Sequence, residues 1–266
     1  MSRFSSKARG IAAAIVVAGI AAAGGANAAI VVQDNYFGGL NTYNGSDVIG
    51  PTNVFDISDA VFKRIGAGGN TLQVTINTNY SGVPGTAAAD GTGYGALFIT
   101  PGANAWNPTG PAPYANDVYQ PGQWAYAFTV PQTPSGNSGT ASLYATNDGA
   151  VILSNVFGNT ITAPFPGNPG FYFRQGQAVQ FAANNNATAL AGGGWAANPG
   201  QLVFTIDDNH LLGNSFAFSW AMTCGNDVIQ GQVTGLPEPT TWALSIMGFA
   251  ALGAMLRRRR AAAVTA

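Results

Sequence analysis

The sequence predicts an all-β fold for the long central part of this 266-residue chain, most simply an antiparallel β-sandwich or jelly roll. Glycine is abundant, with 36 residues, and Asn, Thr, Ser and Pro accompany it, while lysine and glutamate are nearly absent. Short aromatic and β-branched runs alternate with turn residues, and no central stretch sustains an apolar period of 3.6 residues. Many antiparallel strands in one domain most often form a sandwich, and a closed barrel is the alternative.

The runs expected to form strands are short and separated by turn residues. In order they are 30–37, 54–57, 61–65, 71–80, 94–100, 124–130, 141–146, 151–156, 171–174, 178–181, 202–206, 216–223 and 228–233. The stretches between them that are long enough to be extended loops are 81–93, 102–122 and 182–200. Loops of that length often carry function in compact domains.

One of these runs shows clear alternation. Leu72, Val74 and Ile76 interleave with uncharged polar residues, which is typical of a strand with one face buried. The preceding run, 61–65, is joined to it by the glycine-rich stretch 66–70. Because glycine readily adopts the positive φ of a tight turn, the two runs are expected to form a hairpin.

The first 28 residues have the pattern of a secretory signal peptide. An apolar core at 11–23 follows a positively charged start and precedes a small-residue cleavage site. Thirteen apolar residues are too few to span a bilayer comfortably. The mature chain is therefore expected to begin at Ala29. The residues concerned are Arg3, Lys7 and Arg9 in the charged start, and Ala26 and Ala28 at the cleavage site.

The segment 236–260 combines a short motif, an apolar run and a cluster of arginines. Glu238, the only glutamate of the chain, lies between Pro237 and Pro239, which favour extended backbone. The apolar run 240–256 would be roughly 25 Å long as a helix, short for a hydrocarbon core of about 30 Å but sufficient when arginines snorkel at one end. The four arginines at 257–260 mark the cytoplasmic side.

This order of features resembles the PEP-CTERM sorting signal of exported bacterial proteins, which an exosortase processes. The resemblance covers about a tenth of the chain, and Leu236 and Thr240 stand where the usual pattern has Val and Ser. An ordinary single-pass anchor with an accidental Pro-Glu-Pro is the alternative. The resemblance implies a processing motif at Pro237, Glu238 and Pro239, a transient anchor from Trp242 to Leu256, and a stop-transfer cluster at Arg257, Arg258, Arg259 and Arg260.

The same resemblance implies where the protein goes and what handles it. It would be exported across the inner membrane of a Gram-negative bacterium by the secretion translocon, with signal peptidase and an exosortase-type enzyme as partners. It would be held transiently in the inner membrane and end at the cell surface or outside the cell. The expected organisation is a signal peptide at 1–28, an ectodomain at 29–235, the sorting signal at 236–260 and a short tail at 261–266.

The ectodomain is acidic once both ends are set aside. It keeps three basic side chains, Lys63, Arg64 and Arg174, against ten aspartates, so its formal charge is −7. Such a surface would be repelled by the phosphates of nucleic acid and by anionic lipid. Neutral or cationic partners and divalent cations remain compatible with this charge.

The loop 102–122 is the candidate ligand-binding segment. It combines prolines, which stiffen the backbone, with aromatic rings that could stack on a sugar face. The alternative is that these rings pack over the sandwich as a lid, since aromatic side chains are usually buried. The possible ligand-binding residues are Trp106, Tyr114 and Tyr119.

No residue pattern points to catalysis, and no cofactor is expected. Cys224, the only cysteine, lies in an apolar run and is expected to be buried, and His210 is expected to lie in a turn. Two aspartate pairs could be interpreted as glycosidase carboxyls, but aspartates also serve turns. Calcium stays open because oxygen ligands are plentiful, whereas a single His and a single Cys disfavour zinc. The pairs are Asp56 with Asp59 and Asp207 with Asp208.

A second resemblance concerns two blocks seen in exported proteins with this sorting tail, 47–50 and 220–229. It implies a β-rich exported protein without an assigned activity, and a turn at Asn226 and Asp227 that places the last strand beside 216–223. We therefore expect a non-enzymatic protein of the cell envelope or extracellular matrix, associated with exopolysaccharide or biofilm. The alternatives are a carbohydrate- or calcium-binding surface module and a surface hydrolase that uses aspartate pairs.

Overall fold

The computed structural model describes residues 28–39, 47–84, 92–131, 136–154 and 174–237, and, further on, residues 248–250, 252–255 and 257. These residues form mostly antiparallel β-sheet, which confirms the all-β prediction. Residues 171–173 of the strand predicted at 171–174 and most of the predicted signal peptide lie outside the described residues.

Ten strands form one hydrogen-bonded sheet, and all their pairings are antiparallel. Their order across the sheet is β1-β2-β3-β10-β9-β6-β5-β4-β11-β12. The strands are β1 (Ile30–Gln33), β2 (Ile57–Ile65), β3 (Thr71–Thr78), β4 (Leu97–Pro101), β5 (Tyr126–Thr129), β6 (Ser138–Ala145), β9 (Ala191–Asn198), β10 (Gln201–Ile206), β11 (Phe216–Ala221) and β12 (Val228–Val233).

Two further strands pair separately, and the helical pieces are short. The separate pair is β7 (Gly149–Leu153) with β8 (Ala178–Ala183). The helical pieces are α1 (Thr52–Phe55) and the 3-10 turns η2 (Ala67–Gly69) and η3 (Thr146–Asp148).

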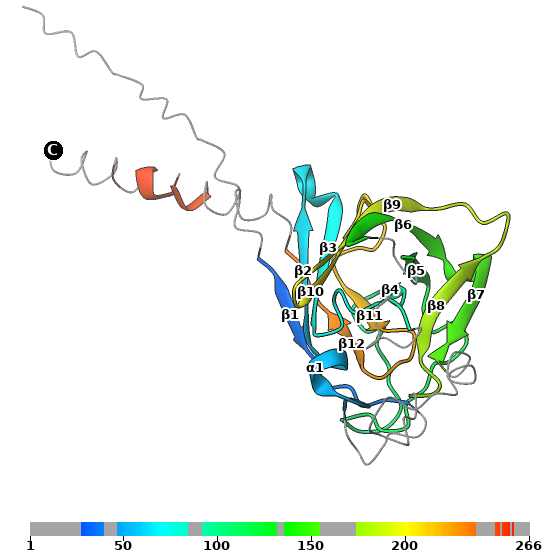
Figure 1. Ribbon diagram of the computed structural model, residues 1–266. Coiled ribbons are helices and arrows are strands. Elements are labelled where there is room, and N and C mark those ends of the chain that lie inside the picture. The colour runs from blue at the N-terminus through cyan, green and yellow to red at the C-terminus, as the bar shows by residue number, and fades with distance from the viewer. Residues whose placement is uncertain are drawn as a thin grey trace, which may run out of the picture.

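The ten-stranded sheet curls so that its two ends meet (Figure 1). Strands β1 and β12, at opposite ends of the strand order, contact each other, and β12 also contacts β2. A Cβ added at Gly231 of β12 would lie 2.9 Å from a methyl group of Val32 of β1, so glycine permits this close approach. The ring of Phe62 on β2 lies 4.5 Å, centroid to centroid, from that of Phe218 on β11. One face of the sheet is thereby folded over a shared apolar core.

Alternation along the strands follows the predicted pattern. Leu72, Val74 and Ile76 of β3 are fully buried, whereas the polar residues between them are only half-buried. Each fully buried side chain of this size contributes about 1.5–3 kcal/mol relative to an exposed one. The burial of one face fixes the register, because a shift by one residue would expose all three.

The two predicted hairpin arrangements are confirmed. Strands β2 and β3 pair up to Ile65 and Thr71, and between them Gly66 and Gly68 adopt φ values of 79° and 70°. These left-handed conformations explain why glycine is needed there. Strand β12 lies beside β11, as expected for a turn at Asn226 and Asp227.

The prediction of a strand at 54–57 is wrong for most of its length. Residues 52–55 form the single turn of α1 instead, and β2 begins only at Ile57. Pro51 precedes the turn, and its carbonyl accepts hydrogen bonds from the backbone N–H groups of Val54 and Phe55. The fixed φ of proline favours this position directly before a helical turn, which outweighed the β-propensity of the two apolar residues.

The predicted loop 182–200 contains strand β9, so that prediction is also wrong. The strand is rich in glycine and alanine, which are poor strand formers by propensity. Its packing explains the composition, because a Cβ added at Gly193 would lie 2.0 Å from the carbonyl oxygen of Thr205 on the neighbouring strand β10. Strand β9 therefore pairs closely with β10 because it lacks side chains at this point.

The predicted membrane anchor lies largely outside the described residues, including Trp242 and Leu256. The C-terminal residues that are described, 248–250, 252–255 and 257, are helical and exposed. No helix among the described residues is long and apolar enough to cross a membrane.

Candidate functional site

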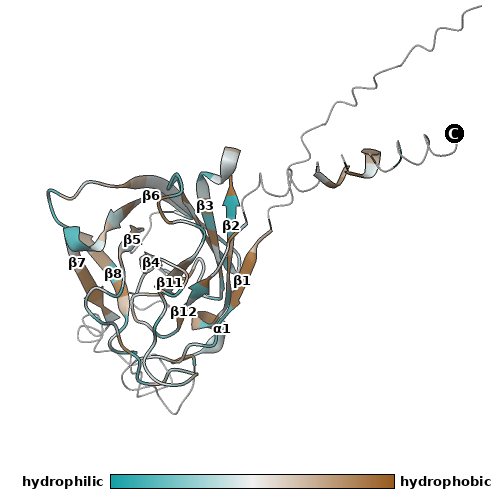
Figure 2. Cartoon of the chain, turned by 180° about the vertical axis from the view of Figure 1, so that it is seen from behind, coloured by the Kyte–Doolittle hydropathy of each residue, from teal (hydrophilic) through white to brown (hydrophobic). Residues whose placement is uncertain are grey.

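A groove of about 490 Å³ lies beside the two end strands of the sheet, and we call it the edge groove. Strand β1 is apolar along much of its length (Figure 2), and its Val31 is 52% exposed. An exposed apolar edge strand of this kind is a common docking position for partners. The lining residues are Ile30, Val31, Val32, Gln33, Asn35, Trp106, Ala112, Tyr114, Gln230, Gly231 and Gln232.

The side chain of Gln232 fixes the start of the loop 102–122 at the groove. Its Oε1 accepts hydrogen bonds from the backbone N–H groups of Ala105 and Trp106, both at 3.1 Å. Its Nε2 donates to the carbonyl of Gly102 at 2.9 Å. Strand β12 thus positions the indole of Trp106 through a side chain that satisfies three backbone groups.

Asp117, which is buried, organises the far part of the same loop. Its carboxylate accepts hydrogen bonds from the hydroxyl of Tyr36 at 2.6 Å and from the backbone N–H of Thr109 at 2.7 Å. Burial of Tyr36 and the neighbouring carboxylate raise the pKa of that phenol above its usual range, so it stays a donor. The backbone N–H of Phe37 also donates to the carbonyl of Pro113 at 2.8 Å. The loop is therefore tied to the segment that follows β1.

Two aromatic rings of the loop meet at the groove. Trp106 and Tyr114 lie 5.0 Å apart, centroid to centroid, in an edge-on arrangement, and Tyr36 stacks on Tyr114 at 6.1 Å. Tyr114 has a φ of 66°, an unusual value for a bulky residue that surrounding contacts must support. The structure therefore brings together Trp106 and Tyr114, two of the three residues predicted for ligand binding.

The third predicted residue, Tyr119, does not line the groove. It packs instead against the buried cluster that contains Phe98 and Trp124, and its backbone N–H donates to Gly176. Both rings at the groove also pack against a small buried cluster, so the loop covers the body as well as lining the groove. The alternative that these rings pack over the body as a lid thus holds for Tyr119, and in part for Trp106 and Tyr114.

The groove offers polar groups without charges. No charged side chain is among its lining residues. Nε1 of Trp106 and Oε1 of Gln230 are inaccessible to solvent and have no hydrogen-bond partner among the described residues. A buried donor and acceptor without partners cost free energy, which a ligand with hydroxyl or amide groups could recover after a small side-chain movement.

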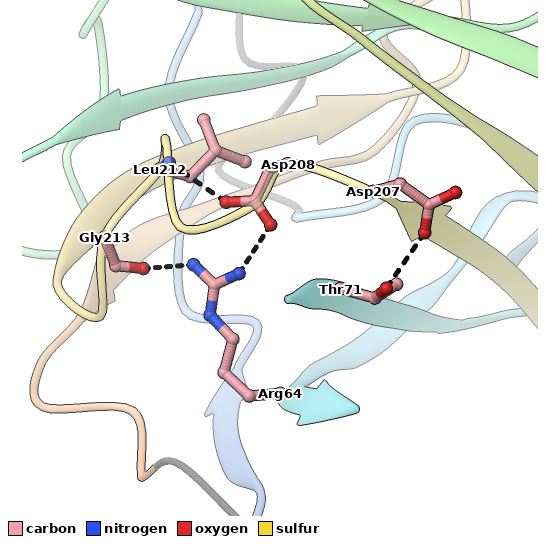
Figure 3. Close-up of polar contacts among 6 residues, drawn as sticks. All are labelled: Arg64, Thr71, Asp207, Asp208, Leu212 and Gly213. Atoms are coloured by element: carbon pink, nitrogen blue, oxygen red, sulfur yellow. Dashed lines mark hydrogen bonds and ion pairs between the residues drawn. The ribbon is translucent and has the colours of Figure 1, made fainter. Parts of the chain in front are cut away.

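Three of the four aspartates in the hydrolase alternative use their carboxylates for contacts within the fold. Figure 3 shows Asp208 in an ion pair with the buried Arg64 at 2.5 Å, while its other oxygen accepts from the backbone N–H of Leu212 at 3.0 Å. Asp207 accepts a hydrogen bond from Thr71 at 2.9 Å. Asp59 accepts from Asn77 at 2.6 Å. These carboxylates are bound to neighbouring side chains and backbone.

A different group of aspartates was not predicted from the sequence. Asp34, Asp47 and Asp227 each place one carboxylate oxygen within 4.8 Å of the others, and we call them the acidic cluster. They come from the segment after β1, the loop before α1 and the start of β12. Three hard oxygen donors at this spacing can hold a divalent cation.

Burial dominates the electrostatics of the acidic cluster. It raises the pKa of Asp34 and Asp227 well above the usual range, the neighbouring carboxylates raise it further, and Arg174 opposes both effects. The pKa of Asp47 is raised to about 6, again mainly by burial.

The two residues considered for nucleophilic chemistry occupy the predicted environments. Cys224 is free and fully buried, and burial raises the pKa of its thiol to about 12. The burial predicted for this cysteine is confirmed, and a protonated, enclosed thiol is inert. His210 lies in a turn with a φ of 66°, and its carbonyl accepts from the N–H of Gly213 at 2.9 Å.

The residues directly before the predicted sorting motif are held by hydrogen bonds to the folded body. Leu236 is 1% exposed, and its backbone N–H donates to Asn214 at 2.7 Å. The N–H of Gly235 donates to the hydroxyl of Ser215 at 2.9 Å. Pro237, the first residue of the predicted motif, is half-buried. Glu238, Pro239, Arg258, Arg259 and Arg260 lie outside the described residues, as does Ala26, whereas Arg257 is exposed and Ala28 half-buried.

Comparison of the chain with known protein families, with curated proteins and with solved structures found no match.

Proposed function

We propose that this chain is an exported, non-enzymatic β-protein of the cell envelope or extracellular matrix, which an exosortase-type enzyme processes at Pro237, Glu238 and Pro239. The observation that supports the proposal is that Leu236, the residue directly before the motif, still belongs to the packed body, where it is buried and its N–H donates to the carbonyl of Asn214. A processing enzyme needs extended, accessible backbone, and two prolines around Glu238 favour it. The secretion translocon and signal peptidase would act earlier, with the peptidase cleaving after Ala28.

The architecture we propose for the body is a sandwich formed by one curled sheet. Its two halves face each other across the core, where the ring of Phe204 on β10 lies 6.5 Å, centroid to centroid, from that of Trp220 on β11. Facing layers that share a core are the defining feature of sandwiches. Such a body suits a role in company with exopolysaccharide, because its few charged residues and its Asn, Thr and Ser content make a hydrated surface.

The processing proposal is tested with Glu238→Ala in the full chain, expressed in a bacterium that processes tails of this kind. Wild-type protein is expected at the surface or in the medium without its arginine tail. The variant is expected to stay in the inner membrane with that tail attached. Thr234→Ala is the matched control, because Thr234 is exposed and lies just before the motif. Equal trimming of Glu238→Ala and Thr234→Ala would contradict the proposal.

A second candidate function is carbohydrate binding at the edge groove. The groove has no charged lining, presents two aromatic rings, and contains an indole donor and an amide acceptor without partners among the described residues. Sugars offer hydroxyl groups for such partners and apolar faces for rings. The loop is also held in place by Gln232 and Asp117, which reduces the cost of ordering on binding.

Pull-down by neutral polysaccharide tests this second function. Trp106→Ala is expected to weaken retention about tenfold, which corresponds to about 1.4 kcal/mol. Tyr119→Ala, in the same loop but outside the groove, is the control and should retain wild-type binding. Unchanged retention by Trp106→Ala, with an unchanged circular dichroism spectrum, would exclude the groove as the binding site.

A further inference from the structure

The acidic cluster has the spacing of a calcium site. Calcium binds oxygen ligands at about 2.3–2.6 Å, so two oxygens on opposite sides of one ion are separated by up to roughly 5 Å. The cluster oxygens of Asp34, Asp47 and Asp227 all lie within 4.8 Å of one another. One ion can therefore contact a carboxylate oxygen from each residue without rearrangement of the backbone.

The nearby guanidinium does not form ion pairs with these carboxylates. Arg174 is fully buried, and its Nε and Nη1 donate to the carbonyls of Gly225 at 3.0 Å and Gly38 at 2.7 Å. Its Nη2 donates to the carbonyl of Asp47, again a backbone group. In the described part of the chain the only ion pair is the one between Arg64 and Asp208.

The charges of this region balance only when the carboxylates bind a cation or protons. With all three carboxylates ionised, they and the one guanidinium carry a net charge of −2, and buried charge without compensation is costly. One divalent cation would balance it. This charge balance is a separate consideration from the spacing of the oxygens, and both indicate a divalent cation.

Unpartnered buried oxygens at the cluster are the third observation. Oδ2 of Asp34 and Oδ1 of Asp47 are inaccessible to solvent and accept no hydrogen bond from the described residues. Buried polar atoms are nearly always satisfied, so two unpartnered carboxylate oxygens in one cluster call for a missing partner that accepts electron pairs.

We propose that Asp34, Asp47 and Asp227 bind one calcium ion, which fastens the first strand, the loop before α1 and the final hairpin to one another. Calcium suits the site better than zinc because all the donors are carboxylate oxygens and no His or Cys takes part. None of the three aspartates lines the edge groove or belongs to the predicted sorting motif, so this structural site extends the proposed function.

The test uses the purified full chain in detergent, stripped with EDTA and then titrated with calcium chloride. Equilibrium dialysis is expected to find one calcium per chain. At a free calcium concentration about 100 times the dissociation constant, the Tm is expected to rise by roughly 5–10 °C. Asp34→Asn is expected to weaken binding at least tenfold and to abolish most of this shift. Magnesium at the same concentration is expected to give a smaller shift, because it demands stricter octahedral geometry.

The matched control is Asp207→Asn, which removes an exposed carboxylate that is bonded only to Thr71. It should bind calcium as the wild type does. If Asp34→Asn fails to fold, Asp47→Asn provides the same comparison from a different segment. The proposal is overturned if the wild type binds no calcium, or if both cluster variants bind it with unchanged affinity.

Discussion

The two buried arginines of the body, Arg64 and Arg174, hydrogen-bond to different kinds of group. Arg64 faces one carboxylate, that of Asp208, and the two charges cancel within 2.5 Å. Arg174 lies near three carboxylates but gives its hydrogen bonds to backbone carbonyls. The first arrangement balances its two charges within the protein, whereas in the second the ionised carboxylates would exceed the one guanidinium by two charges. The difference shows that a buried arginine marks a structural pair only when its donors reach the acid.

The largest loss of stability is expected when the ion pair between Arg64 and Asp208 is broken. Arg64→Met leaves the carboxylate of Asp208 buried without its cation, which should cost about 3–5 kcal/mol of unfolding free energy in urea denaturation. Lys63→Met, one residue earlier and half-buried, is the control and should cost less than about 1 kcal/mol. A loss below about 1 kcal/mol for Arg64→Met would mean that the pair contributes little.

Removal of both charges tests whether the unpaired carboxylate of Asp208 causes this loss of stability. The double variant Arg64→Met with Asp208→Leu should regain much of the stability lost by Arg64→Met alone, because no unpaired charge remains. The effect on calcium binding should be nil for either variant, since this pair is separate from the acidic cluster. A double variant less stable than Arg64→Met would argue that the hydrogen bond from Leu212 to Asp208 matters more than the charge.

A smaller change in stability is expected when the pH of the calcium-free protein is raised. The folded-state pKa of Asp47 is raised from 3.8 to about 6, and those of Asp34 and Asp227 are raised too. The folded state therefore binds more protons than the unfolded state, and stability should fall as the pH rises from about 4 through 6. Thermal melts in EDTA between pH 4 and 7 measure this loss, and Asp47→Asn should flatten it. A Tm that rises over this range would contradict the assigned direction.

The smallest effect concerns Cys224, which adjoins Gly225, one of the carbonyl partners of Arg174. Because its thiol is buried and its pKa is about 12, alkylation at pH 8 should require local opening of the final hairpin. Labelling with iodoacetamide, followed by mass spectrometry, should be at least about 100-fold slower than in urea. Calcium should slow it further if it fastens this end of the body. Rapid labelling of the folded protein would show that the hairpin opens freely.

The fold was predictable where side-chain pattern determines it. Leu72, Val74 and Ile76 indicated one buried face, and the last strand was expected at the residues where β12 lies. Strand β9 was not predictable by the same reasoning, because its glycines serve a close approach to β10 that only the three-dimensional pairing reveals. A local sequence pattern therefore predicts strands whose side chains are buried in the core. It misses a strand such as β9, in which glycines allow a close approach to the neighbouring strand.

The sites were predictable only in part, for a similar reason. The composition of the loop 102–122 indicated Trp106 and Tyr114, but not that β1 and β12 complete the groove. The acidic cluster joins Asp34, Asp47 and Asp227 from three distant segments, and no spacing in the sequence relates them. A local motif search finds ligands within one loop, whereas these come together only when the ends of the sheet meet.

The most direct test of the proposed function is mass spectrometry of the mature protein from membrane, surface and medium fractions. The account predicts an N-terminus at Ala29 and a C-terminus near Pro237, Glu238 and Pro239 in the surface and medium fractions. The arginine tail should be found only in the membrane fraction. An intact cluster from Arg257 to Arg260 on protein recovered from the surface would contradict the account.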